Sequence, residues 1–368
     1  MEALRDVTRS DDGIDEVSQR LLASAARLSR NALTEIDWDT PLEKDKYGCS
    51  PEWSTLYRTA YWDEMTEQQR IALTRHETAS IMSIGIWFEM MLQEMVIRDQ
   101  YLGDYHRPEF QFALTEVADE CRHSLMFAKT SYKLTGTSYT PHPRLGRFGK
   151  LFMRVAGSEV AYAGILAAEE VLDVLQRGCM RDDRVLPLVR TVNEIHVLEE
   201  SRHMRFAREE VRQSMAEASW TRRQLSSVIT AMAVSYILVS LVRPKAYADA
   251  GLDHRRAVGE MRRNHHFQSM VRSGCAHLMG FLDEWVCSPG PRRASTARCT
   301  CSDGPVPNVP GDHESWCGGV MIVALTNESK SSMPVPSGKW SAKSVSSAAR
   351  PCAVAKVATA IGEMVATD

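Results

Sequence analysis

The chain has 368 residues, which is enough for one large domain or two smaller ones, and its formal net charge is −3. Hydrophobic residues make up 44% of it, a share typical of a soluble globular domain with a real core. Acidic and basic residues are mixed along the sequence, whereas a nucleic-acid footprint needs a clustered basic face. The composition therefore argues against a nucleic-acid partner.

The N-terminus, Met1 to Asp6, lacks the apolar segment of a secretory signal, so we predict a cytoplasmic protein. The apolar run at residues 228–242 has about 15 residues, fewer than the roughly 20 that span a bilayer. We interpret it as a buried helix and expect no membrane association. The nine cysteines are an odd number in a cytosolic context and predict no disulfide framework. Cys299 and Cys301 lack the spacing of a zinc site.

Helical periodicity dominates the first three quarters of the chain. Residues 1–60 contain one predicted amphipathic helix, at 14–28, and then a loop. Residues 61–286 form the predicted main domain, with long helices at 66–99, 108–134, 158–177, 186–215, 221–241 and 254–285. Between the second and third of these, two prolines and two glycines predict a loop: Pro141, Pro143, Gly146 and Gly149. No useful stretch alternates with a period of two, so the predicted fold class is all-α.

Residues 287–368 differ abruptly in composition from the helices. Pro, Gly, Ser and Cys dominate, and most of the helical periodicity is lost. Such a segment buries too little apolar surface to offset the entropy of ordering it. We therefore predict a poorly ordered C-terminal tail after the helical domain.

Two short stretches of the chain repeat one another. Glu120 and His123 are separated by two residues, and so are Glu200 and His203. Residues three apart are neighbours on a helix, so each pair presents a carboxylate and an imidazole on one face. Two such pairs, with one further Glu from each of two other helices, hold two irons or manganeses in a four-helix bundle. The repeat therefore predicts a dimetal centre.

Two glutamates in apolar surroundings supply the remaining carboxylates. Glu89 is the only charged residue at 81–92, and Glu169 and Glu170 are the only ones at 160–171. A helix that is apolar on nearly every side is buried, and an uncompensated buried carboxylate is costly. No Lys or Arg lies on either stretch, so metal cations are the expected counter-charge. About 100° of rotation separates adjacent helix residues, so Glu169 and Glu170 cannot both point inward.

His196 lies four residues before Glu200 and seven before His203, on one stripe of the helix. The candidate metal ligands are thus four carboxylates and three imidazoles: Glu89, Glu120, His123, Glu169, His196, Glu200 and His203. This mixture suits iron, with manganese as the alternative. Other assignments stay open at this point: Glu94 in place of Glu89, His196 as a core residue, and Glu170 and Glu199 as outer residues. Arg122 and Arg202 are expected to pair with acids such as Asp119 or Glu199.

These residues resemble the AurF family of diiron oxygenases over roughly residues 60–285. The resemblance is carried by Trp87-Phe88-Glu89, by Asp119-Glu120 through Phe127, by Ala168-Glu169 and by His196 through His203. It implies a ferritin-like four-helix bundle core with additional flanking helices. It also implies seven ligands in this order, and the interval to His196 favours Glu169 over Glu170. In such a centre Glu120 and Glu200 would bridge two Fe ions, and Glu89 and Glu169 would be terminal.

The resemblance further implies O2 as co-substrate and a small substrate, most of all an aromatic amine that is oxidised at nitrogen. Electrons would come from an external ferredoxin or reductase, because no Gly-x-Gly-x-x-Gly nucleotide fingerprint follows a strand. A homodimer is the assembly to be considered. Two alternatives stay open: a hydroxylase or desaturase acting on carbon, and a non-enzymatic ferritin-like iron-binding protein. Four side chains are expected near the metals by helical spacing: Met90, Met91, Met126 and Phe127.

Overall fold

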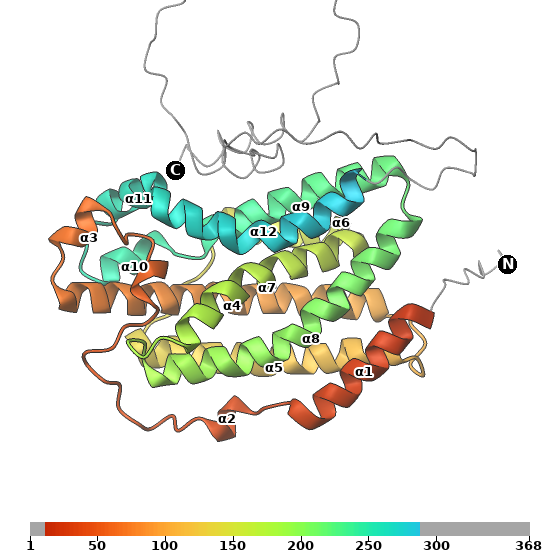
Figure 1. The fold of residues 1–368 in the computed structure, drawn as a ribbon, viewed down its shortest axis with the longest axis horizontal. Coiled ribbons are helices and arrows are strands. Elements are labelled where there is room, and N and C mark those ends of the chain that lie inside the picture. Colours follow the sequence, from red (N-terminus) through yellow and green to blue (C-terminus); the bar gives the residue numbers. More distant parts are fainter. Residues whose placement is uncertain (1–11, 288–368) are drawn as a thin grey trace, which may run out of the picture. The chain divides into compact units, whose positions relative to one another are not determined.

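The structure is a computed structural model that describes residues 12–287. In that range it is helical and holds no β-strand, only an isolated parallel bridge between Tyr47 and Val185. The elements, labelled in Figure 1, are α1 (Asp12–Leu28), α2 (Ala32–Glu35), a 3-10 turn η1 (Pro51–Trp53), α3 (Ala60–Glu64), α4 (Glu67–Gln100), α5 (Pro108–Thr135), α6 (Pro143–Val155), α7 (Ser158–Met180), α8 (Pro187–Glu217), α9 (Trp220–Ser240), α10 (Pro244–Asp249), α11 (His254–Arg263) and α12 (His265–Cys287). The predicted all-α class is confirmed.

Four long helices form the centre of this part of the chain. Helix α4 packs along α5, and α7 packs along α8; contacts of α4 with α7 and of α5 with α8 close the bundle. Figure 1 shows α1 crossing α5 and α8 on one side, and α9 and α12 covering α7 on the other. This is a ferritin-like four-helix core with flanking helices. The division into regions 1–60, 61–286 and 287–368 stays a prediction, and the predicted tail order and its cysteines lie outside the described residues.

Short sequence signals set where the long helices begin and end. Thr66 caps α4, and Gln69 returns a bond to the Thr66 backbone, which completes a capping box. Pro108 and Pro187 occupy the first turns of α5 and α8, where a missing N–H costs nothing. Helix α5 ends at Gly136, whose φ of 68° lies in the left-handed region that glycine tolerates. These signals fix the ends of α4, α5 and α8, three of the helices that carry candidate metal ligands.

The loop predicted before α7 was wrong for Pro143–Val155, which form helix α6. Pro143 stands in the first turn, and the His142 side chain accepts a hydrogen bond from the Arg144 amide, so proline here starts a helix. Gly149 serves close packing, because a Cβ there would lie 2.6 Å from Cζ2 of Trp87 on α4. The glycine that had suggested a break is therefore a contact residue inside a helix.

The predicted helix at 254–285 is two helices, α11 and α12, separated at Asn264. The Asn264 side-chain oxygen accepts hydrogen bonds from the amides of His266 and Phe267 and so caps α12. Its amide nitrogen donates to the carbonyls of Thr55 and Tyr57. These long-range bonds hold the break, which periodicity alone could not reveal.

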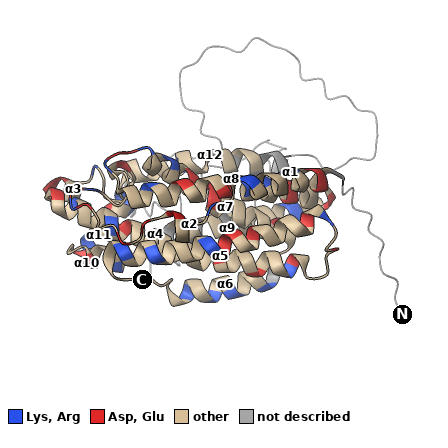
Figure 2. Ribbon diagram, turned by 90° about the horizontal axis from the view of Figure 1, so that it is seen from below, with Lys and Arg blue, Asp and Glu red and all other residues tan. Residues whose placement is uncertain are grey.

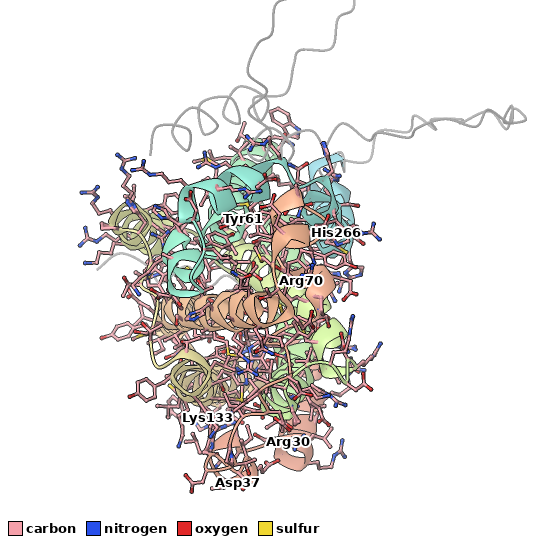
Figure 3. The ribbon with its side chains drawn as sticks, turned by 90° about the vertical axis from the view of Figure 1, so that its left-hand side faces the viewer. Arg30, Asp37, Tyr61, Arg70, Lys133 and His266 are labelled. Carbon is pink, nitrogen blue, oxygen red and sulfur yellow. The ribbon has the colours of Figure 1, made fainter. Side chains whose placement is uncertain are left out.

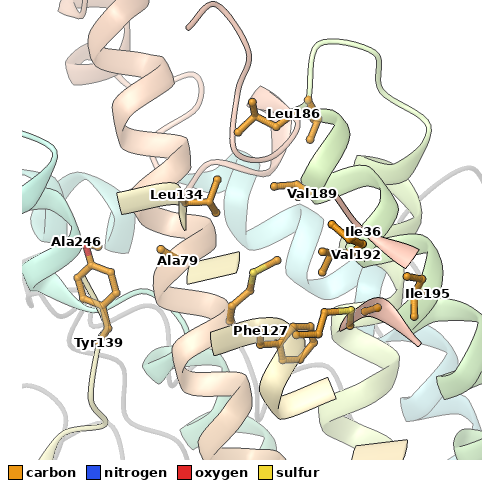
Figure 4. Close-up of a cluster of buried hydrophobic side chains, with 14 residues drawn as sticks. Ile36, Ala79, Phe127, Leu134, Tyr139, Leu186, Val189, Val192, Ile195 and Ala246 are labelled. Carbon is orange, nitrogen blue, oxygen red and sulfur yellow. The ribbon is translucent and has the colours of Figure 1, made fainter. Parts of the chain in front are cut away.

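A buried apolar cluster joins α4, α5 and α8 at one end of the bundle (Figure 4). Phe127 on α5 and Val192 and Ile195 on α8 belong to it, together with Ala79 on α4. The Phe127 ring centroid lies 4.8 Å from that of His196. The cluster therefore ends directly against the polar centre of the bundle.

A second apolar cluster packs α3, α10 and α11 against the start of α4. Tyr61, Arg70 and His266, labelled in Figure 3, lie in this region. Arg70 stacks over the Trp62 ring at 5.3 Å, and His266 Nε2 lies 2.9 Å from the Glu52 carbonyl oxygen. The short helices are therefore held to the bundle by aromatic and polar contacts as well as by apolar packing.

Figure 2 shows acidic and basic residues interspersed along most helices, in agreement with the mixed charge of the sequence. Among the described helices, α4 alone is long and apolar enough to span a membrane, with a mean hydropathy of 1.3 over 18 residues. Half of that window is buried inside the protein, and α4 also carries the buried Glu77 and Glu89. We therefore treat α4 as a core helix of the bundle. The cytoplasmic location stays a prediction.

Candidate metal centre

The seven candidate ligands come from all four bundle helices and lie together in the interior. Helix α4 contributes one, α5 two, α7 one and α8 three, and each side chain is at most 3% exposed. Their donor atoms form three overlapping groups in which all atoms lie within 4.8 Å of one another. The groups are Glu120, His123, Glu200 and His203; Glu89, His123 and His196; and Glu169, His196 and Glu200.

The two Glu-x-x-His pairs face one another across the bundle. His123 Nδ1 lies 2.9 Å from Glu120 Oε2 and 3.1 Å from Glu200 Oε1. His203 Nδ1 lies 2.9 Å from Glu120 Oε1 and 3.1 Å from Glu200 Oε1. Each carboxylate thus reaches both imidazoles, which is the position that a ligand bridging two cations requires.

The outer nitrogens of these imidazoles are anchored crosswise. His123 Nε2, on α5, lies 2.8 Å from Glu199 Oε2 on α8, and His203 Nε2, on α8, lies 3.3 Å from Asp119 Oδ2 on α5. Arg122 pairs with Asp119, and Arg202 Nη2 lies 3.6 Å from each of the two acids. These pairs agree with the expectation from the sequence. Because an outer carboxylate sets ring orientation, each imidazole presents Nδ1 to the centre.

His196 is also anchored by an outer partner, but the roles of its two ring nitrogens are reversed. Its Nδ1 lies 2.9 Å from Gln176 Oε1 on α7, which leaves Nε2 facing inward. Nε2 lies 3.6 Å from both Glu89 Oε1 and Glu200 Oε1 and has no hydrogen-bond partner. Burial lowers the pKa of His196 to about 4, so the ring is neutral and Nε2 keeps a free lone pair. A neutral imidazole is the form that binds a metal.

The pKa values of the four carboxyl groups shift in opposite directions: those of Glu89 and Glu169 are raised, and those of Glu120 and Glu200 are lowered. Burial raises the pKa of Glu89 and of Glu169 well above the ordinary value, and neighbouring carboxylates raise it further. Burial also acts on Glu120 and Glu200, but there the nearby imidazoliums outweigh it and lower the pKa. Two of the four groups are therefore acids and two are carboxylates when no metal is bound.

Charge balance supports a pair of divalent cations. Burial lowers the pKa of His123 and His203, yet the facing carboxylates outweigh it and hold both rings protonated, with the pKa well above the usual value. Without metal, two imidazoliums thus balance two carboxylates. Four carboxylates, three neutral imidazoles and two divalent cations also sum to zero, which is the condition for burying such a group without an unpaired charge.

Unpaired buried atoms also fit a metal. One carboxylate oxygen of each of Glu89, Glu120, Glu169 and Glu200 is buried without a hydrogen-bond partner, as is the inward nitrogen of His196. Buried polar atoms are nearly always paired, so five unpaired atoms on neighbouring ligand candidates need an explanation. Carboxylate oxygen and imidazole nitrogen are the donors that iron and manganese bind. The residues present therefore fit a dimetal centre.

The competing residues lie elsewhere. Glu94 is exposed on α4, and Glu170 pairs with Arg208 and His277. His76 bonds Tyr139, and His266 bonds a carbonyl in η1. Of the four apolar residues expected near the site, Phe127 lies against His196, and Met126 is buried in the same apolar cluster as Phe127. Met90 is 62% exposed and Met91 packs toward α6, so the expectation was wrong for Met90.

Two buried polar residues of the site were missed. Gln176 lies seven residues after Glu169, so a search for polar side chains two turns along the same helix face could have found it. Glu116 lies one turn before Glu120, is fully buried, and has no partner for either oxygen. Burial raises its pKa to about 8, while the positive His203 opposes the shift. It therefore brings a protonated carboxyl group close to the centre at neutral pH.

Changing Glu199 to Gln is expected to weaken binding of Fe(II) about 10–100-fold, the usual effect of losing an outer partner of a ligating histidine. Burial raises the pKa of Glu199, but the bond with His123 and the Arg30 amide outweigh it and bring the pKa to about 2. The variant keeps the shape and loses the charge that orients the ring. Glu194→Gln, an exposed position on the same helix, is the matched control. Metal titration of both variants tests this, and equal affinities would contradict it.

The sequence comparisons agree with this geometry. Residues 11–285 match the family described as P-aminobenzoate N-oxygenase AurF. An uncharacterized protein of Mycobacterium bovis is 27% identical over 241 residues, which cover 63% of this chain and 71% of that protein. An uncharacterized protein of Mycobacterium tuberculosis strain H37Rv matches with the same values. The family match spans almost all described residues and all seven candidate ligands, so this chain is a member of the AurF family of diiron oxygenases.

Proposed function

We propose that this protein holds two iron ions and uses O2 to oxidise the nitrogen of a small aromatic amine. The seven ligands of the candidate set hold the ions: Glu89, Glu120, His123, Glu169, His196, Glu200 and His203. The observation that carries the proposal is the third imidazole, His196, whose unpartnered Nε2 faces the two Glu-x-x-His pairs. Bound iron would supply the electrons and the open coordination positions that activate O2.

The protein's own contribution is to hold the ligands and to exclude water. Glu199 holds the ring of His123 in one orientation before metal binds, and Asp119 does the same for His203. An apolar cluster of α4, α7 and α9 includes Ile84, Ala168 and Leu172, so it is built in part on the two helices that carry Glu89 and Glu169. Such walls keep water from a reactive centre and suit the apolar ring of an arylamine.

Oxygen insertion requires an external electron donor. Formation of a hydroxylamine from an amine and O2 places one oxygen atom on nitrogen and the other in water, and it consumes two electrons and two protons. We propose a ferredoxin or a reductase as the source. The protonated carboxyl group of Glu116, one turn from Glu120, is a candidate donor of a proton to the site.

A single-turnover assay tests the proposed function. Protein loaded anaerobically with iron and reduced chemically is exposed to ¹⁸O2 and a panel of aromatic amines, and products are analysed by mass spectrometry. We expect a hydroxylamine or a nitro compound that carries ¹⁸O, and none from protein without iron. Products oxidised only at carbon would instead support a hydroxylase or desaturase. Iron accumulation without any organic product would support an iron-binding protein.

A further inference from the structure

The segment at residues 121–158 is strongly basic, although acidic and basic residues are mixed along the chain as a whole. It contains no Asp or Glu and holds seven cationic residues: Arg122, Lys129, Lys133, Arg144, Arg147, Lys150 and Arg154. The last four lie on α6, a helix of 13 residues. Figure 2 shows α6 at the lower edge of the bundle with its basic residues in blue. The segment therefore concentrates positive charge on one short helix.

The cations of α6 share its outward side. Four exposed residues form what we call the α6 cation face: Arg144, Arg147, Lys150 and Arg154. At about 100° per residue they occupy a sector of about 120°. The opposite side holds Leu145 and Phe152, each 5% exposed. Within the described residues 12–287, no ion pair engages Arg147, Lys150 or Arg154. Their charge is therefore available to a partner.

The inner side of α6 packs over α4 and α7, two of the helices that carry candidate ligands. A Cβ at Gly149 would lie 2.6 Å from Cζ2 of Trp87, which precedes Glu89 by two residues on α4. A Cβ at Gly164 of α7 would lie 3.4 Å from Cζ of Phe152. Gly149 is the midpoint of α6, and two residues advance a helix by only about 3 Å, so α6 meets α4 near the level of Glu89. One helix, about 10 Å thick, therefore separates the α6 cation face from α4 at this level.

We propose that the α6 cation face is the docking surface of an acidic iron–sulfur protein that supplies electrons to the metal centre. This inference rests on the proposed function, which needs an external donor of two electrons. Two reduced donor molecules, binding in turn, each lose one electron and together supply the two that N-oxidation consumes. A cluster held by four thiolates carries net negative charge in both oxidation states, so it complements the cations of α6. Electron transfer through protein slows steeply with distance, which favours a surface only one helix away from α4.

The apolar residues of α6 argue against a membrane as the partner. A basic amphipathic helix binds a bilayer through an exposed apolar face. On α6 that face is already used inside the protein, since Leu145 and Phe152 are buried and Phe152 reaches α7. Leu151 is 58% exposed and lies within the sector of the cations. An apolar contact surrounded by a polar rim is the arrangement of protein–protein interfaces.

Charge reversal on the α6 cation face tests the docking. The probe is a plant-type ferredoxin, and isothermal titration calorimetry measures its binding to the iron-loaded protein. Arg147→Glu combined with Arg154→Glu should weaken binding at least about tenfold. The matched control is Arg255→Glu combined with Arg262→Glu, which makes the same charge change at the same spacing on exposed positions of α11. The control should change the affinity less than about twofold, and raising NaCl from about 20 to about 200 mM should weaken wild-type binding. Circular dichroism confirms that both variants are folded.

The electron source separates this inference from the proposed function. After chemical reduction, the α6 variant should give as much product in a single turnover as wild type. With NADPH, a reductase and ferredoxin, its KM for ferredoxin should rise, whereas that of the α11 control should not. Absence of product from chemically reduced wild type contradicts the proposed function, while calorimetry alone decides the docking surface.

Two results would overturn the docking surface. One is a ferredoxin that does not bind wild type, or that binds the α6 variant as tightly as wild type. The other is sedimentation of wild type, but not of the α6 variant, with phosphatidylglycerol vesicles and no binding to ferredoxin. That result would assign the α6 cation face to a membrane.

Discussion

Glu120→Ala is expected to remove most of the iron, from two ions per chain to fewer than one, and to lower oxygenase activity at least about 100-fold. The lower bound is the loss that even outer-partner changes can cause at a metal site. The physical reason is the central position of this carboxylate. Its two oxygens lie 2.9 Å from His123 Nδ1 and from His203 Nδ1, so it is the group best placed to bridge two ions. Without it, neither pair retains its shared ligand.

Glu94→Ala is the matched control for that loss. Glu94 lies on the exposed side of α4, outside the metal-ligand groups, although its sequence position made it the competitor of Glu89. Iron content by plasma emission and coupled-iron signals by Mössbauer spectroscopy should be unchanged in this variant. Circular dichroism shows whether Glu120→Ala is folded. A folded Glu120→Ala protein that still binds two coupled irons would remove the basis of the proposed centre.

Affinity for Fe(II) is expected to rise steeply with pH, by at least about 100-fold per unit between pH 6 and 8, which corresponds to two or more displaced protons. The sign follows from the protonation of the metal-free site. Glu89, Glu169, His123 and His203 all have raised pKa values and hold protons near neutrality. Metal must displace these protons, so raising the pH favours binding and acid favours release.

Titration in weakly buffered solution with a pH indicator measures the released protons directly. The stability of the protein should follow the same dependence, because ligands that bind only the folded state add about 4 kcal/mol at a thousandfold excess over Kd. Iron should therefore raise the melting temperature at pH 7.5 and have a much smaller effect at pH 5.5. An affinity that does not change with pH would mean that these side chains are not the ligands.

Local patterns in the sequence were sufficient to identify the bundle and the candidate ligands. A Glu and a His three residues apart on a helix must share a face, and a lone Glu in an apolar helix must face a counter-charge. Both arguments use only distances along one helix. They placed Glu89 and Glu169 beside the two Glu-x-x-His pairs, as the structure does. Their roles as ligands await the metal experiments.

Contacts between helices were not predictable in the same way. Helix α6, which the sequence had assigned to a loop, packs against Trp87. The break at Asn264, inside a region assigned to one continuous helix, is held by the carbonyls of Thr55 and Tyr57. These partners lie far away in the chain. From sequence alone, a proline or glycine is interpreted as a helix breaker unless the distant residue that packs against it is known.

The paired Glu-x-x-His pattern by itself predicted a helical bundle with a dimetal centre, and the added His196 pointed to the AurF family, which the family match confirms. Tertiary structure decided which nitrogen of each ring faces the centre. The crossed anchors, Glu199 to His123 and Asp119 to His203, join different helices, and so does Gln176 to His196. It also decided that Met90 faces outward, because exposure depends on which sides of a helix its neighbours cover. Ligand spacing is a property of one helix, whereas ring orientation and free surface are properties of the packed bundle.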